Sequence, residues 1–102
     1  MKMITDDNMK EAMQADVAVV DFNAVWCGPC KMLGPVLEQL AEEMEGKVEF
    51  FSCDVDENMA LSADYNIQSV PTVLLLKKGT VVSQSIGFRP KDAMRSWIES
   101  NC

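Results

Sequence analysis

The 102-residue sequence contains no histidine, only nine basic residues against sixteen acidic ones, and no long apolar run. The net charge of −7 argues against binding to nucleic acid or to an anionic membrane surface, because no basic stripe offsets repulsion by phosphate groups. No apolar stretch approaches the roughly 20 residues that cross a bilayer. The N-terminal segment turns acidic without an apolar core, so we expect no signal peptide.

Cysteine is also scarce, with four in the chain. A ribbon-type zinc site needs a second cysteine pair or histidine ligands, whereas Cys53 and Cys102 lie far apart and there is no histidine. Nor does this count predict a disulfide-stapled secreted scaffold. Length and composition agree with a small cytoplasmic protein. In such a reducing compartment, two close thiols are more often catalytic than structural. The chain has no glycine-rich dinucleotide loop, and we expect no bound cofactor.

The most informative segment is Trp26-Cys27-Gly28-Pro29-Cys30. An apolar run over 17–22 predicts a buried strand before it, and apolar spacing over 31–44 predicts a helix after it. Cys27 therefore lies where a strand passes into a helix, whose unpaired first-turn amides favour a thiolate. We predict Cys27 as the nucleophile and Cys30, one turn further in and better shielded, as the resolving thiol. The alternatives are a zinc half-site and an inert pair in the core.

Length and ordinary composition predict one domain over 1–102, without linkers or repeats. Periodicity predicts strands at 1–4, 17–22, 48–55, 73–77 and 81–86, and helices capped by Thr5, over 31–44, over 58–65 and from Pro90. Strands separated by helices should be parallel, and the turn Lys78-Gly79-Thr80 should close an antiparallel hairpin. We therefore expect an α/β fold, a mixed sheet with helices on both faces. Its methionines are expected mostly to pack at apolar helix positions.

The segment over 21–32, Asp-Phe-Asn-Ala-Val-Trp-Cys-Gly-Pro-Cys-Lys-Met, resembles the active-site signature of the thioredoxin family, and the resemblance runs through the whole chain. It implies the thioredoxin fold, with five strands and the cysteine-bearing strand in the middle. It further implies a monomeric dithiol carrier that reduces disulfides in substrate proteins through a reversible Cys27–Cys30 disulfide. An NADPH-dependent thioredoxin reductase would restore the dithiol. A binding module of the same fold and a disulfide isomerase or oxidase remain alternatives.

Further positions carry this resemblance. Val70-Pro71-Thr72 looks like the family's cis-proline segment, which would offer the Val70 backbone to an extended substrate. Gly87 matches a glycine that lets substrate approach closely. Trp26 is expected to be a surface aromatic beside the nucleophile, and Gly28-Pro29 resembles the spacer of reductants rather than oxidants. The alternatives are a strand-opening proline, a turn glycine and a core tryptophan.

Asp21 is a carboxylate inside an apolar strand, where packing would not favour it. It matches the family's buried aspartate, which suggests that it handles the proton of Cys30, with a pKa raised by burial. The chain departs from the family at two nearby positions. Asn23 replaces a usual tryptophan, which should alter packing beneath the site. Ser52 replaces a common lysine, so Asp21 lacks the usual compensating charge.

Overall fold

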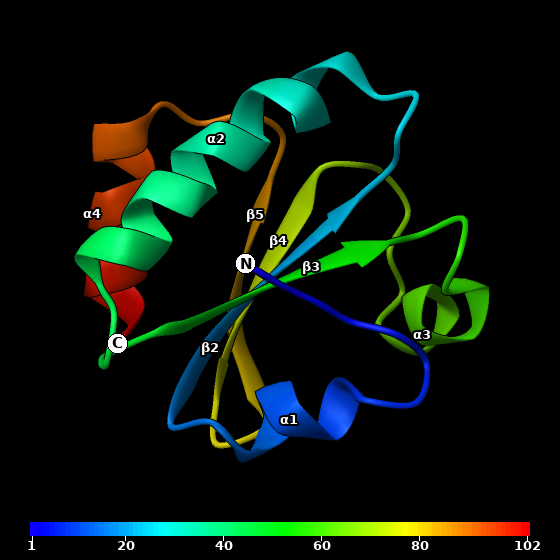
Figure 1. Cartoon of the computed structure of the whole chain (residues 1–102), viewed down its shortest axis with the longest axis horizontal. Helices are drawn as coiled ribbons and strands as arrows, with labels where there is room; N and C mark the ends of the chain where they lie inside the picture. The colour runs from blue at the N-terminus through cyan, green and yellow to red at the C-terminus, as the bar shows by residue number, and fades with distance from the viewer.

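The computed structural model describes residues 1–102 and contains one five-stranded mixed sheet with helices on both faces (Figure 1), as predicted. The strand order is β1-β3-β2-β4-β5, so β2, the strand that leads to the motif cysteines, is central, as the resemblance implies. The elements in chain order are β1 (Lys2–Met3), α1 (Met9–Gln14), β2 (Val17–Asn23), α2 (Gly28–Glu43), β3 (Glu49–Asp54), α3 (Met59–Asp64), β4 (Thr72–Lys77), β5 (Thr80–Ile86) and α4 (Lys91–Asn101).

Each face of the sheet has its own hydrophobic core. Helices α1 and α3 cover one face, where Ala12 and Leu61 pack against Phe22 and neighbouring strand residues. Helices α2 and α4 cover the other face, where Leu37 and Ile98 pack against the opposite side of the same strands. Burial on both faces explains why β2 reads as a continuous apolar run rather than an alternating one. No helix in the structure combines the length and apolarity that crossing a bilayer requires.

The expected methionine packing is wrong for half of the eight residues. The exposed methionines are Met3, Met13, Met32 and Met59. Met13 and Met32 fit an apolar helical spacing, yet each lies at the edge of its helix's apolar stripe and faces solvent. The flexible side chain of methionine tolerates such positions, so its periodicity is a weak guide to burial.

The prediction that strands separated by helices are parallel fails at β4. Strands β1, β2 and β3 are mutually parallel, but β4 runs antiparallel to β2, with Thr72 opposite Phe22. The shortness of α3 does not explain this direction, because α1 is equally short and joins the parallel strands β1 and β2. The chain after α3 reaches the end of the sheet where β2 and β3 end, and β4 starts there, paired with β2.

The first helix also begins later than predicted. Thr5 does not cap it, because the Thr5 backbone N–H donates to Asn8 Oδ1 at 2.6 Å and Thr5 Oγ1 accepts from the Asp7 N–H. These local bonds form a separate turn, and α1 starts at Met9. Short polar side chains stabilise turns and helix starts by the same kind of bond, so the pattern alone does not separate the two.

The predicted hairpin between β4 and β5 is confirmed. Lys78 and Gly79 form its two-residue loop, and both have positive φ values, of 50° and 85°. Such a loop matches the twist of the paired strands. A side chain at position 79 would lie 3.0 Å from the Met13 carbonyl oxygen, which adds a packing reason for glycine there.

Candidate active site

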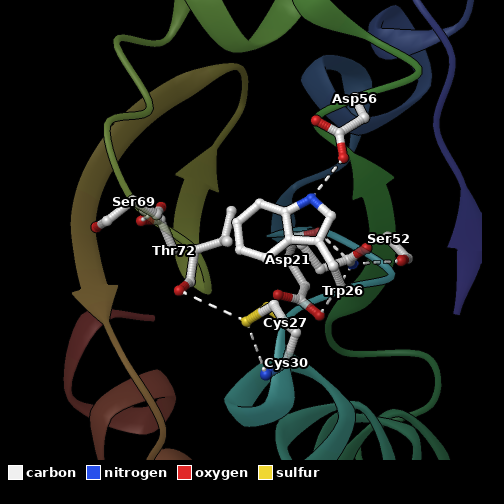
Figure 2. Close-up of a disulfide and its surroundings, with 10 residues drawn as sticks. Asp21, Trp26, Cys27, Cys30, Ser52, Asp56, Ser69 and Thr72 are labelled. Atoms are coloured by element: carbon white, nitrogen blue, oxygen red, sulfur yellow. Dashed lines mark hydrogen bonds between the residues drawn. A yellow bond between two sulfur atoms is a disulfide. The ribbon is translucent and has the colours of Figure 1, made fainter.

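The two motif cysteines form a disulfide at the junction of β2 and α2 (Figure 2), with their Cα atoms 5.3 Å apart. Cys27 is the N-cap of α2, and its carbonyl accepts the first helical hydrogen bond, from the Lys31 N–H. Pro29 lies in the first turn, where a proline removes no needed donor. The structure thus places Cys27 at the helix start, as the sequence predicts.

The surroundings of Cys27 Sγ favour negative charge. The backbone N–H of Cys30 points at this sulfur, with an N–S distance of 3.2 Å. The first turn of α2 contains no acidic residue, so nothing there opposes the positive end of the helix dipole. After reduction, the same amide can donate to a thiolate on Cys27, which stabilises the nucleophilic form.

The expected difference in shielding between the thiols is wrong for the disulfide form. Cys27 is 5% exposed and Cys30 is 6% exposed, because both lie under the loop that precedes β4. Their surroundings differ in bonding rather than in burial: the Cys27 sulfur is the one that a backbone amide approaches.

The loop before β4 lies against the disulfide. The Val70–Pro71 peptide bond is cis, as the resemblance implies, and the Val70 carbonyl oxygen lies 3.7 Å from Cys27 Sγ. The Gly87 N–H donates to the Pro71 carbonyl at 2.9 Å, which joins the end of β5 to this loop. Gly87 has a φ of 87°, and a Cβ there would meet no atom within 4 Å. The space beside Gly87 is open, as close approach by another chain requires.

Trp26 is a surface aromatic, as predicted, with 68% of its area exposed. Its indole N–H donates to Asp56 Oδ2 at 2.8 Å, which holds the ring beside the disulfide (Figure 2). Trp97, by contrast, lies on the buried face of α4 and packs in the core. A small hollow of about 140 Å³ lies between Trp26 and Val70.

Asp21 lies in the middle strand, only 1% exposed, and its carboxylate points toward the start of α2, where both cysteines lie (Figure 2). Burial raises the pKa of Asp21 to about 6, and a hydrogen bond from Asn23 opposes that rise. The predicted burial and the predicted direction of the pKa are therefore confirmed. A carboxylate with such a pKa can exchange a proton near neutral pH.

The sequence interpretation missed what Asn23 does. Its side-chain amide donates to Asp21 Oδ2 and to Ser52 Oγ, so the two departures from the family pattern contact each other. The signal was present in strand periodicity, because residues 21 and 23 share a face. The resemblance had placed Ser52 near Asp21, but the hydrogen bond between Asn23 and Ser52 was not predicted, since the register that sets Ser52 opposite Asp21 is not visible in the residue pattern.

The largest cavity of the protein does not belong to this site. The largest cavity, about 490 Å³, is at the other edge of the sheet, near Val17, Lys47 and Glu49. No group of three or more histidine, cysteine, aspartate or glutamate side chains is arranged to hold a metal ion. The chemistry available at the disulfide is that of two sulfurs, a buried carboxylate and backbone donors.

Comparison with known proteins agrees with this geometry. The family model described as Thioredoxin matches residues 1–100. The chain belongs to the thioredoxin family. A thioredoxin of Staphylococcus haemolyticus is 42% identical over 98 residues, which cover 96% of this chain and 94% of that protein. A thioredoxin of Bacillus subtilis is 43% identical over 97 residues, covering 95% and 93%. A solved structure, a mutant thioredoxin from Halobacterium salinarum NRC-1, superposes with a TM-score of 0.90 at 37% identity, covering 98% of this chain and 88% of that one.

Membership of the thioredoxin family and the Cys27–Cys30 disulfide establish the activity in general terms. The protein is a protein-disulfide oxidoreductase, a dithiol carrier that reduces disulfides through a reversible disulfide of its own. Its substrates are disulfide-containing proteins, and a reductase returns the electrons that each turnover transfers.

Proposed function

We propose that Cys27 is the nucleophile that attacks substrate disulfides and that Cys30 is the thiol that resolves the intermediate. The observation that carries this assignment is the Cys30 backbone N–H, which is directed at Cys27 Sγ from the first turn of α2. A donor in this position stabilises a thiolate on Cys27, and no corresponding donor approaches Cys30 Sγ.

In the first step, the Cys27 thiolate attacks one sulfur of the substrate disulfide. The new sulfur–sulfur bond joins Cys27 to the substrate, and the second substrate sulfur leaves as a thiolate that takes a proton from solvent. In the second step, Cys30 loses its proton to the Asp21 carboxylate and attacks Cys27 Sγ. The substrate's remaining sulfur then leaves as a thiolate, and two electrons have passed from the Cys27–Cys30 dithiol to the substrate.

A substrate-binding surface surrounds the disulfide in this proposal. The Val70 carbonyl beside Cys27 offers a hydrogen-bond acceptor to an extended peptide, while the exposed ring of Trp26 supplies apolar contact area. Gly87 leaves room for the peptide backbone. The proposed binding residues are Trp26, Gly28, Pro29, Val70, Pro71 and Gly87.

We further propose that the electron donor is an NADPH-dependent thioredoxin reductase and that residues 1–102 work as one monomeric domain in the cytoplasm. The net charge of −7 supports a protein that binds neither nucleic acid nor anionic membranes. Re-reduction assays with and without NADPH test the first point, and gel filtration of the reduced protein tests the monomeric state.

Trapping of the mixed disulfide tests the assignment of roles. Cys30→Ser should accumulate a covalent complex with a disulfide-bonded substrate such as insulin, because the second step lacks its thiol. Cys27→Ser, the matched variant, should form almost none under the same conditions. Peptide mapping by mass spectrometry should find the substrate cysteine joined to Cys27. Equal trapping by the two variants would overturn the assignment.

A further inference from the structure

A side-chain amide connects two strands beneath the disulfide. Asn23 Nδ2 lies 3.1 Å from the Asp21 carbonyl oxygen, 3.3 Å from Asp21 Oδ2 and 2.8 Å from Ser52 Oγ. An amide nitrogen has two hydrogens, which these three acceptors share. The shortest of the three bonds is the one to Ser52, on β3, so the amide is held by a strand other than its own.

The two oxygens of Asp21 differ in their surroundings as a result. Oδ2 accepts from Asn23, whereas Oδ1 is buried and has no hydrogen-bond partner in the protein. An acceptor left unpaired in a side chain that is 1% exposed is costly, and protonation relieves that cost. Oδ1 is therefore the oxygen on which a proton is most favourable.

We propose that Asn23 is a positioning residue for disulfide exchange: held by Ser52, its amide binds Oδ2 of Asp21 and leaves Oδ1 to receive the proton of Cys30. This inference rests on the proposed role of Asp21 in the second step. Asn23 makes its side-chain hydrogen bonds to Asp21 and Ser52 and none to either sulfur, so it acts through Asp21. The neutral amide of Asn23 thus takes the place of the lysine that the family commonly has at position 52.

The hydrogen bonds among Asn23, Asp21 and Ser52 also affect the pH range in which Asp21 can accept a proton. Burial raises the pKa of Asp21, and the Asn23 amide lowers it, since the donor favours the charged carboxylate. Neither register partner of Asp21 is charged, for these are Ser52 on β3 and Val73 on β4. The titratable and charged groups on the surrounding elements are Glu49, Cys53 and Asp54 on β3, Cys27 at the N-cap of α2, Cys30, Lys31, Glu38, Glu42 and Glu43 on α2, Lys77 on β4, and Lys91, Asp92, Arg95 and Glu99 on α4.

None of these groups makes a hydrogen bond or an ion pair with the Asp21 carboxylate. Lys91 and Arg95 pair with Glu43 instead, and Lys77 lies at the other end of β4. Asn23 is consequently the one side chain in the structure that donates to Asp21. Its removal should therefore affect Asp21 directly, without the loss of a second partner.

Replacement of Asn23 by alanine is the direct test, with two readouts in the full-length protein. The midpoint of the Asp21 titration, followed by NMR of its carboxyl carbon, should rise by on the order of one pH unit. The midpoint of the pH profile of insulin reduction should rise with it, so that turnover falls several-fold at pH 6.5 and recovers toward pH 8.5. A merely structural role for Asn23 would lower activity without moving either midpoint.

Two companion variants complete this test. Ser52→Ala removes only the hydroxyl that holds the amide, and it should shift both midpoints in the same direction by a smaller amount. It decides the question alone if Asn23→Ala does not fold. Asn101→Ala removes a half-buried amide that donates to the Trp97 carbonyl far from the site, and it should shift neither midpoint. Unchanged midpoints in both Asn23→Ala and Ser52→Ala would overturn the inference.

The Asp21→Asn background separates this inference from the proposed function. If Asp21→Asn leaves the pH profile as in the wild type, the role of Asp21 itself is wrong. If Asp21→Asn abolishes the profile while Asn23→Ala does not move it, only the positioning role of Asn23 is wrong. In the double variant, Asn23→Ala should produce no further shift, because the group that it positions is gone.

Discussion

The chain holds one kind of reactive group, the cysteine thiol, in two contrasting surroundings. Cys27 caps a helix, where the Cys30 amide points at its sulfur. Cys53 lies in β3, fully buried in the core beneath α1 and α3. Burial raises the pKa of the Cys53 thiol to about 11, and the negative charges of Asp6, Asp54 and Asp21 contribute to the rise.

The difference between the two thiols teaches that position in the fold decides reactivity. Both cysteines are less than 10% exposed, so burial alone does not separate them. What separates them is the presence of a nearby donor: a helix start with a backbone N–H faces Cys27, whereas Cys53 packs among apolar side chains, and the negative charges of Asp6, Asp54 and Asp21 add to the effect of burial on its pKa. A thiolate is favoured at the first site and disfavoured at the second.

The largest expected effect separates the two thiols by activity. Cys27→Ser should lower insulin reduction by at least about 1,000-fold, because Cys27 is the proposed nucleophile of the first step. Cys53→Ala should keep turnover within about twofold of the wild type. A steady-state assay with matched protein concentrations measures both. A large loss in folded Cys53→Ala would show that β3 supplies a third catalytic thiol.

A second measurement compares the thiols by chemistry instead of turnover. In the reduced, folded protein at pH 7, iodoacetamide should modify Cys27 faster than Cys53 by more than about 100-fold. With a pKa of about 11, Cys53 has a thiolate in roughly one molecule in ten thousand at this pH. Peptide mapping over time gives both rates. Similar rates at the two residues would erase the contrast.

The third prediction concerns Asp21, the buried carboxylate of β2, which Asp21→Asn replaces by a neutral amide. Because the folded pKa of Asp21 is raised to about 6, the free energy of unfolding of the wild-type protein falls as pH rises from about 4 through 6. This loss of stability is absent below the unfolded pKa, and it approaches roughly 3 kcal/mol above the folded one. The variant should therefore gain stability over wild type by more at pH 8 than at pH 5. Denaturant melts of the oxidised proteins measure this, and an equal gain at both pH values would contradict it.

The smallest effect concerns the remaining thiol. Cys102 is exposed at the C-terminal end of α4, without the converging amide of Cys27 or the core packing of Cys53. Cys102→Ser should leave the free energy of unfolding within about 0.5 kcal/mol and turnover within about twofold. Non-reducing electrophoresis should show that any covalent dimer depends on Cys102. A strong loss of activity would mean that the end of the chain contacts the site.

The sequence predicted most of the fold because its signals are local. The apolar run of β2, the helical spacing after Cys30 and the Lys78-Gly79 turn each depend on neighbouring residues alone. The orientation of β4 was predicted wrongly, since it depends on which end of the sheet the chain reaches after α3, and pairing with β2, remote in sequence, sets that end. The false cap at Thr5 failed for a related reason, because turns and helix starts share their polar residues.

The site divides in the same way. The placement of Cys27 at a helix start followed from a strand pattern next to a helix pattern, and the burial of Asp21 followed from its apolar neighbours. The contact between Asn23 and Ser52 joins residues from two strands, and only the register of the sheet brings them together. The equal exposure of Cys27 and Cys30 likewise depends on the loop before β4, which is remote in sequence.

The antiparallel direction of β4 has a consequence for how the chain could be divided. Val70 and Cys27 are 43 positions apart in sequence, yet the Val70 oxygen lies near the Cys27 sulfur because β4 begins at the end of the sheet where β2 ends. A parallel β4 would begin about 20 Å away, at the opposite edge. A fragment that stops before β4 would keep both motif thiols and lose the backbone that lies against them. Cutting the chain between α3 and β4 and mixing the two halves would therefore couple reassembly of the sheet to recovery of the proposed substrate-binding surface.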